Sequence, residues 1–358
     1  MSDSTKKAER GRRNHKFDLL RILFATFVLL AHAPELTDGN LSRELLARTL
    51  HTSFNFGALG VDGFFLLSGF LIVQSWQGNP EFSNFFRKRL LRIVPGYVVA
   101  ALLATLVVGL LAPGVPHFFK QLNHHYVISV LMLGKLATPP VFPGSFTDAI
   151  NGSLWTIPYE VRCYFIVALW GICGFFRRPL LWLGTTVFLL FLLVFPALTG
   201  PPEGWRTLYY LTGQPAQIAR LTSAFFVGGC FWLFRRFISF RGALALPAAV
   251  IILVVAAFGP THIEPAIVVF GGYLLFYFGQ LTSVPLGWMR SVPDISYGVY
   301  LYGGPVEGLW IWYLRGSPWV AFVGATIISF ALGWLSWHFV ERPMLTFKRR
   351  TIAPLPPP

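Results

Sequence analysis

The stretch FDLLRILFATFVLLAH, residues 17–32, decides how this chain folds. It is an apolar run of the kind that crosses a membrane as a helix, yet it contains Asp18, Arg21 and His32. Arg21 and His32 are eleven residues apart, close to three helical turns, so they share one stripe about 16 Å apart, and Asp18 lies one turn before Arg21. Because ionisable groups are costly in lipid, we expect this stripe to face the protein interior or a watery cavity.

The composition indicates a polytopic membrane protein. Of the 358 residues, 54% are hydrophobic and 12% are charged. The net charge of +14 does not indicate a nucleic-acid partner, because the basic residues form short clusters between apolar runs. The cysteines Cys163, Cys173 and Cys230 lie inside apolar runs without pairing or metal-binding spacing, so we expect packing residues and no metal site.

The apolar runs predict an all-α bundle of about ten transmembrane helices surrounded by membrane lipid. The predicted spans are 17–34, 56–76, 92–112, 153–176, 180–198, 217–234, 243–259, 265–282, 293–314 and 318–339. The apolar stretch 125–136 is too short to span, so we expect it to be interfacial or re-entrant within the long loop 113–152. The chain then divides into a basic tail 1–16, a transmembrane domain 17–343 and a tail 344–358.

The distribution of Lys and Arg predicts the orientation, because cytoplasmic loops retain positive charge. With a cytoplasmic N-terminus, the cytoplasmic side receives the N-terminal tail, Arg87, Lys88, Arg89, Arg92, Arg177, Arg178, Arg235, Arg236, Arg241, Arg290, Arg342, Lys348, Arg349 and Arg350. The other side receives Arg43, Arg48, Lys120, Lys135, Arg206 and Arg315. This alternation predicts that both termini are cytoplasmic. The N-terminal tail is too basic and polar for a cleaved signal, so we expect the first helix to be retained.

His32 and Glu160 are candidates for proton chemistry. We place Glu160 about two turns below the outer end of its helix, at a depth similar to that of His32. His32 is then either a base in a tunnel or a hydrogen-bonded residue between helices, with Asp18 and Arg21 as an ion pair. Glu160 is either a partner in that chemistry or a counter-ion for Arg162 or Arg220.

Basic and small residues suggest two further features. Arg89 and Arg92 share a helix face, as do Lys88 and Arg92, a cluster that is suited to phosphate but equally expected from topology alone. In the second span, Asp62 either orients His32 or lies among lipid headgroups. The glycines 57, 60, 63 and 69 of that span favour close helix packing over a ligand path.

Six motifs, taken together, resemble those of the membrane-bound acyltransferase 3 family. In order they read FDLLRILFATFVLLAH, GVDGFFLLSGFLI, RKRLLRIVPGY, GSLWTIPYEVRCYF, DISYGVYLYGGP and FVERPM, and they extend from about residue 17 to 343. The resemblance implies transfer of an acyl group, commonly acetyl, from acetyl-CoA in the cytosol to a hydroxyl of a sugar or glycan outside. Acetyl-CoA would be the acyl donor, and the resemblance implies no permanently bound cofactor.

The resemblance also assigns residues. It implies His32 and Glu160 as catalytic and Arg21, Arg89 and Arg92 as the acyl-CoA site, and Ser68 matches the second-span signature of the family without an assigned chemical role. From the residues themselves we expect Asp18 and Asp62, with Ser68, to be supporting residues. The ninth-span motif departs from the family, because Gly303 and Gly304 stand where a histidine is common, so His32 would carry more of the proton work. About 15 residues follow the last span, so we expect no appended hydrolase-like domain.

The expected location is the inner (plasma) membrane, and the expected acceptor is a surface polysaccharide or lipid-linked glycan, most simply exopolysaccharide or lipopolysaccharide. The alternative is a transporter or flippase that uses a His, Glu and Arg proton relay. A transporter predicts internal repetition, and the sequence has no convincing repeat.

Overall fold

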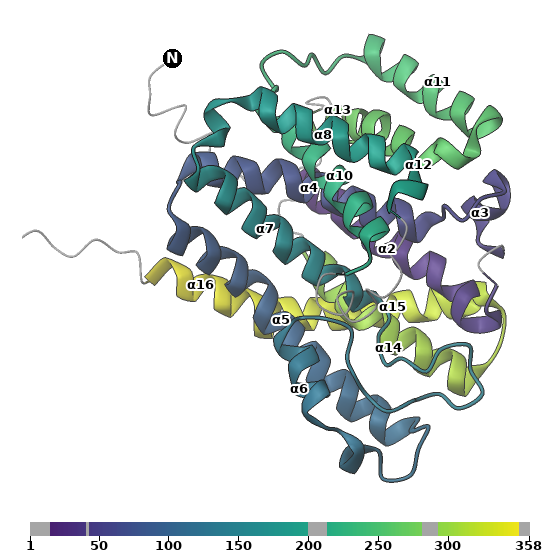
Figure 1. Cartoon of the computed structure of the whole chain (residues 1–358). Helices are drawn as coiled ribbons and strands as arrows, with labels where there is room; N and C mark the ends of the chain where they lie inside the picture. Colours follow the sequence, from purple (N-terminus) through teal and green to yellow (C-terminus); the bar gives the residue numbers. More distant parts are fainter. Residues whose placement is uncertain (1–14, 41–42, 200–212, 281–292, 351–358) are drawn as a thin grey trace, which may run out of the picture.

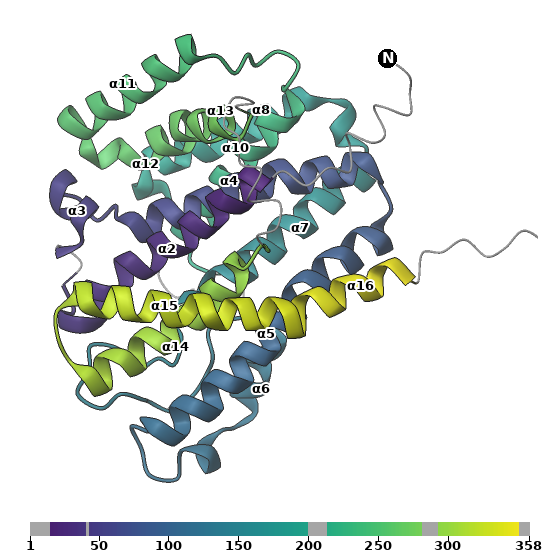
Figure 2. The ribbon, with the colours of Figure 1, turned by 180° about the vertical axis from the view of Figure 1, so that it is seen from behind.

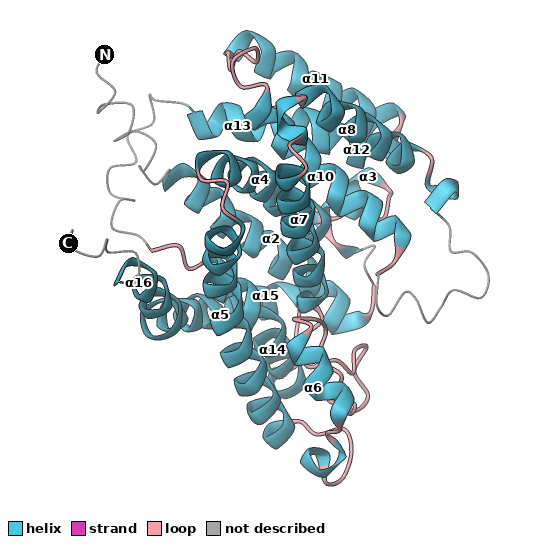
Figure 3. Cartoon of the chain, turned by 60° about the vertical axis from the view of Figure 1, so that its left-hand side comes forward, coloured by secondary structure: helices cyan, strands magenta, loops and turns pink. Residues whose placement is uncertain are grey.

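The computed structural model describes residues 15–40, 43–199, 213–280 and 293–350. The described chain is helical, and its isolated β-bridge joins Pro113 and Val141 (Figure 3). The α-helices are α2 His15–Asp38, α3 Leu45–Leu50, α4 Phe56–Gly78, α5 Phe82–Leu111, α6 His124–Leu131, α7 Ile157–Ile172, α8 Pro179–Val194, α10 Pro215–Leu233, α11 Gly242–Phe258, α12 Ile263–Ala266, α13 Gly272–Gln280, α14 Ser296–Leu314, α15 Pro318–Ser336 and α16 Arg342–Arg350. Short 3-10 helices are η2 Phe118–Gln121, η3 Ser153–Thr156, η4 Phe175–Arg177, η5 Pro196–Thr199 and η6 Pro260–His262, and π-helical turns are η7 Ile267–Gly271 and η9 Trp337–Glu341.

Helices occupy each predicted span, and the chain is a membrane protein with an all-helical fold. Within the described residues, five helical segments are long and apolar enough to cross a membrane: His15–Asp38, Phe56–Gly78, Phe82–Leu111, Pro260–Gln280 and Pro318–Thr346. The helices Pro179–Val194 and Gly242–Phe258 are apolar but shorter. The number of ten spans and the cytoplasmic termini therefore stay predictions. Arg206, Arg290, most of the tail 1–16 and residues 351–358 lie outside the described residues.

Helix α4 lies at the centre of the bundle, between α2 and α10 (Figures 1 and 2). Glycines make this packing close, as the second-span pattern predicted. A Cβ added to Gly69 would lie 1.9 Å from the carbonyl oxygen of Phe225, and one added to Gly228 would lie 2.0 Å from that of Leu66. On the other side, a Cβ on Gly60 would lie 2.6 Å from the carbonyl oxygen of Phe24. Any side chain at these positions would push the helices apart.

Helices α2 and α14 run parallel to each other. Arg21 of α2 contacts Asp294, which lies just before α14, and His32 of α2 contacts Glu307, further along α14. The order of the contacts is the same on both helices. The stripe predicted on α2 therefore faces α14, and a carboxylate meets it near each end: Asp294 just before α14 and Glu307 within it.

Helix α5 begins earlier than the predicted span. It begins at Phe82, so the cluster from Arg87 to Arg92 lies inside the helix and not in the loop before it. Pro95 is consequently a residue of the helix interior, where its ring prevents one backbone hydrogen bond. The helical backbone fixes Arg89 and Arg92 one turn apart on one face, which directs both toward the bundle interior.

The long loop 113–152 folds back along α5. Its helix α6 lies beside the second half of α5 in Figures 1 and 2. The Tyr126 hydroxyl donates to Thr105 Oγ1 at 3.1 Å, and the Tyr97 hydroxyl donates to the Gly134 carbonyl at 2.6 Å. The loop thus returns from the end of α5 toward its middle, and its interfacial or re-entrant position in the membrane stays a prediction.

Candidate active site

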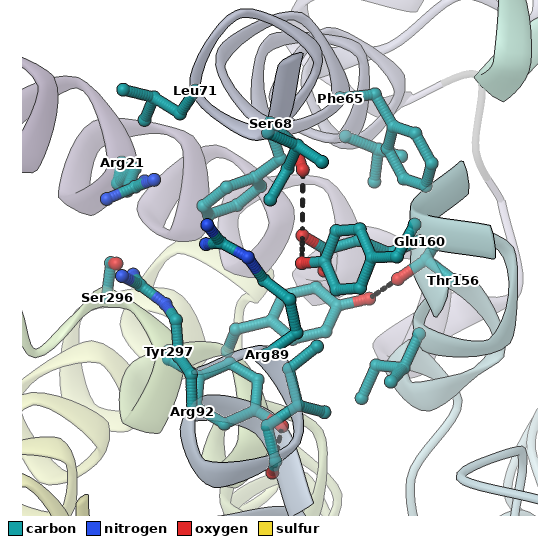
Figure 4. Close-up of a pocket in the computed structure, with 17 residues that line it drawn as sticks. Arg21, Phe65, Ser68, Leu71, Arg89, Arg92, Thr156, Glu160, Ser296 and Tyr297 are labelled. Atoms are coloured by element: carbon teal, nitrogen blue, oxygen red, sulfur yellow. Dashed lines mark hydrogen bonds between the residues drawn. The ribbon is translucent and has the colours of Figure 1, made fainter. Parts of the chain in front are cut away.

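A cavity of about 310 Å³ lies where five elements of the bundle meet: α2, α4, α5, α14 and the η3–α7 segment. Its polar lining residues are Arg21, Ser68, Arg89, Arg92, Thr156, Glu160, Tyr164, Ser296, Tyr297 and Tyr300. The guanidinium groups of the arginines gather on one side, and Ser68 and Glu160 lie on the other (Figure 4). The structure thus brings together predicted site residues from four segments far apart in the sequence.

Asp294 joins two of the three arginines. Its Oδ2 accepts from Arg92 Nη2 at 2.9 Å and from Arg21 Nη1 at 3.3 Å. Ser296 Oγ donates to the other carboxylate oxygen, Oδ1, at 2.6 Å. Asp18 Oδ1 lies 3.8 Å from Arg21 Nη1, so the predicted Asp18–Arg21 ion pair is present, although Asp294 contacts Arg21 more closely.

Arg89 differs from its two neighbours. Its Nε is buried and makes no hydrogen bond within the described residues, and its guanidinium lies 5.5 Å from the centre of the Phe85 ring. A buried guanidinium donor without an acceptor is unfavourable until an anion arrives. Together with Arg21 and Arg92, this donor makes the cavity a site suited to a phosphate-bearing ligand.

Glu160 lies in this cavity and does not orient His32, so that part of the prediction is wrong. Its Oε1 accepts from Ser68 Oγ at 3.0 Å and from the Tyr164 hydroxyl at 2.5 Å (Figure 4). The physical reason is the start of α7: the 3-10 turn Ser153–Thr156 precedes the helix, and Glu160 then projects toward α4 and α5. Ser68, for which the sequence suggested no chemistry, is a direct partner of this carboxylate.

His32 lies apart from the cavity, and its acidic partner is Glu307. His32 Nδ1 is 3.5 Å from Glu307 Oε2, and the exposed side-chain fractions are 21% for His32 and 0% for Glu307. His32 is not among the residues that line the cavity. The rings of Phe64 and Tyr300, which line the cavity, pack at 6.1 Å between centroids.

Asp62 neither orients His32 nor lies among headgroups, which corrects both alternatives. It is fully buried, and its Oδ1 accepts from Arg220 Nη2 at 3.0 Å. Arg220 also donates to Glu264 and to the Ala58 carbonyl. Asp62 therefore belongs to an ionic cluster that ties α4, α10 and α12 together, and Arg220 is not the counter-ion of Glu160.

A comparison with known families decides the class of protein. The model of a family described as "Acyltransferase domain" matches residues 14–338. The chain belongs to this family. The resemblance in the sequence motifs is confirmed, and the chain is a membrane acyltransferase.

Two curated relatives cover nearly the whole acyltransferase. The "O-acetyl transferase" of Shigella phage Sf6 is 25% identical over 342 residues, which are 93% of this chain and 97% of the relative. "Nodulation protein 10" of Rhizobium leguminosarum bv. viciae is 26% identical over 372 residues, with 96% of each chain covered. No solved structure matches the chain significantly.

The sequence reasoning missed three polar residues of the acyltransferase: Asp294, Tyr164 and Glu307. Asp294 and Tyr164 lie inside quoted motifs, DISYG and PYEVRCYF, but were given no role. Glu307 follows the GGP motif in an otherwise apolar helix. An acidic residue within an apolar span is itself a signal, because such a residue needs a partner inside the protein.

Proposed function

We propose that this acyltransferase moves an acetyl group from acetyl-CoA, bound from the cytosolic side, to a sugar hydroxyl on the other side of the inner membrane. The observation that carries the proposal is the cavity with Arg21, Arg89 and Arg92, whose guanidinium groups form a site for the phosphates of CoA. The name of the phage relative, O-acetyl transferase, supports acetyl as the acyl group and oxygen as the acceptor atom.

His32 is the proposed base. In direct transfer, the His32 imidazole takes the proton of the acceptor hydroxyl while the hydroxyl oxygen attacks the thioester carbonyl carbon. The carbon–sulfur bond breaks, and the CoA sulfur leaves as a thiolate that receives the proton from the imidazolium. The products are an acetyl ester and CoA, and no serine or cysteine intermediate is needed. An imidazole suits this role because it exchanges protons near neutral pH.

Glu160 serves the donor side in this proposal. Its carboxylate holds Ser68 and Tyr164 on the cavity wall opposite the arginines, where their hydroxyl groups border the space for the pantetheine arm. That arm has to pass from the arginines toward His32, about 16 Å away along α2.

The acceptor is a surface polysaccharide or lipid-linked glycan in this proposal. The loop 113–152 is its proposed contact, since His124 and His125 at the start of α6 are exposed and aromatic side chains of the loop suit sugar rings. Ten spans with both termini in the cytoplasm would place this loop outside. Nothing in the family match supports a transporter or flippase.

The test uses acetyl-CoA radiolabelled in its acetyl group, offered to membranes that contain the full chain. Label should appear in extracted glycan or lipid, and His32→Ala should reduce the transfer by at least about 100-fold, because general base catalysis contributes roughly 10²–10⁴-fold. His262→Ala is the matched control, since His262 is exposed on η6 and far along the chain from the site residues. Full transfer by the His32→Ala variant would refute the assignment.

A further inference from the structure

We propose that Glu307 is a positioning residue that holds the His32 imidazole through Nδ1 and leaves Nε2 for the acceptor hydroxyl. The inference rests on the proposed role of His32 as base. The inference adds a fixed tautomer for the imidazole and a partner on a second helix, α14, that stabilises the charged form of the base. The contact itself is the 3.5 Å approach of His32 Nδ1 to Glu307 Oε2.

The burial of Glu307 is the first support. Its side chain is 0% exposed, and neither carboxylate oxygen makes a hydrogen bond within the described chain; the approach of His32 Nδ1 at 3.5 Å is an ion-pair contact. A carboxylate in such a place is costly unless a donor or a cation faces it, and His32 is the residue that does. The other acidic group near the pair is Glu35, which is exposed and lies almost one turn after His32 on α2.

Two glycines bring Glu307 close to His32. A Cβ on Gly303 would lie 2.8 Å from Leu29 Cδ1 of α2, and a Cβ on Gly304 would lie 2.7 Å from Asn151 Oδ1. Both positions therefore need glycine for α14 to sit this close to α2 and to the segment before η3. These are the residues that depart from the usual family motif. In this chain the glycines of the motif let α14 lie close to α2, and Glu307, four residues after Gly303, reaches His32 as a result.

Proline and asparagine fix the direction of α14 just before Glu307. Pro305 has no N–H, so the carbonyl of Leu301, four residues earlier, loses its helical partner. Asn151 Nδ2 donates to that carbonyl at 2.8 Å in a buried position. A residue far away in the sequence thus satisfies the group that the proline frees, and the helix keeps one geometry at the point where Glu307 follows.

Phe142 packs against the residue that follows Glu307. Its backbone is in the left-handed region with φ of 53°, a conformation that a bulky residue adopts only where its surroundings impose it. The side chain is 2% exposed, and it lies where a Cβ on Gly308 would be 2.6 Å from Phe142 Cε2. The strained loop residue therefore packs against the residue next to Glu307.

The position of the His32–Glu307 pair along α14 suits transfer of an acyl group that arrives from the cavity. Tyr300 lines the cavity, and Glu307 is seven residues later, two helical turns and about 10 Å further along the same face of α14. With Nδ1–H donated to the carboxylate, Nε2 keeps its lone pair and can accept the hydroxyl proton. The carboxylate then stabilises the imidazolium until the leaving sulfur takes the proton, as an aspartate does in serine hydrolases.

The test compares Glu307→Gln with the wild type in membranes, with acetyl-CoA labelled in its acetyl group and rates expressed per inserted protein. The glutamine keeps the size of the side chain but does not hold the imidazolium charge. We expect kcat to fall at least about 10-fold, with about 10⁴-fold as the upper bound set by loss of an orienting carboxylate, and the KM for acetyl-CoA to stay unchanged. Glu35→Gln is the matched control and should keep the wild-type kcat.

Glu307→Asp is the second variant. It keeps the charge but withdraws the carboxylate by about one carbon–carbon bond, so its kcat should lie between those of Glu307→Gln and the wild type. Wild-type kcat in the Gln or the Asp variant would overturn the inference, as would failure of both variants to accumulate in the membrane, which would make Glu307 a structural residue. If instead His32→Ala transfers label at the wild-type rate, the proposed function fails first.

Discussion

The two ends of the α2–α14 pair hold the same kind of contact in different surroundings. At one end Arg21 meets Asp294 beside a cavity, with further guanidinium groups from α5. At the other end His32 meets Glu307 among packed residues. The first end combines several charges around an open space, which suits recognition of a polyanion. The second isolates one titratable base and one carboxylate, which suits proton transfer.

In the proposed function, the two ends of this helix pair separate the binding of acyl-CoA from the chemistry. The arginine end has several positive charges and is accessible, since the Arg92 side chain is 37% exposed. The histidine end has a buried carboxylate that faces the imidazole. Variants at the two ends should therefore change different kinetic constants: KM for acyl-CoA at the arginine end, and kcat at the histidine end.

The largest expected effect at the arginine end is that of Arg89→Ala combined with Arg92→Ala. Two hydrogen bonds to charged groups, at about 1.5 kcal/mol each, amount to roughly 100-fold in KM for acetyl-CoA, with kcat changing much less. Titration of membranes with labelled acetyl-CoA measures this. Arg87→Ala is the matched control, since Arg87 is on the same helix but does not line the cavity. An unchanged KM in the double variant would leave these arginines with a role in topology only.

A smaller effect is expected for Asp294→Asn. The variant leaves Arg21 and Arg92 without their shared carboxylate, which makes the cavity more positive, so the KM for acetyl-CoA should fall by less than about 10-fold. The protein should also unfold at a lower temperature in detergent. Breaking a buried ion pair costs about 3–5 kcal/mol, and the loss here should be smaller because Arg92 is 37% exposed. A weaker affinity for acetyl-CoA would show that Asp294 orders the arginines more than it neutralises them.

The smallest effect is expected for Asn151→Asp. Aspartate can still accept from the Ser153 N–H, at 3.1 Å in the native protein, but it has no donor for the Leu301 carbonyl. Leaving this buried carbonyl unpaired should cost about 1–3 kcal/mol of folding free energy and lower kcat a few-fold through Glu307. Thermal unfolding and label transfer together measure both. Asn151→Ala removes both bonds and should be at least as unstable. An unaltered kcat would show that the bond to the Leu301 carbonyl does not influence Glu307.

Much of the fold follows from local patterns. Apolar runs gave helices at the predicted spans, and the spacing of Arg21 and His32 placed them on one stripe of α2. The glycine pattern of α4 predicted close packing, which Gly60 and Gly69 confirm. Helix ends were less predictable: α5 begins ten residues before its predicted span, because a helix can continue beyond the apolar stretch.

Partners across the bundle could not be predicted from those patterns. Glu160 and Asp62 were both weighed as partners of His32, yet Glu160 binds Ser68 and Tyr164, and Asp62 binds Arg220. Helix periodicity gives the face on which a residue lies and its depth along the helix. It does not give the neighbouring helix that this face meets, because that depends on how all the helices pack together.

Local patterns in the sequence predict the helices, the inward stripe with Arg21 and His32, and the family to which the chain belongs. Tertiary packing sets the parallel course of α14 beside α2 and places Asp294 and Glu307 at the two ends of the stripe, and the lining of the arginine cavity does not include His32. The reason is physical. A buried charge requires a partner, and the sequence can show that one is needed. The identity of the partner depends on close helix contacts at glycines, on backbone carbonyls freed by proline, and on loop packing between distant segments.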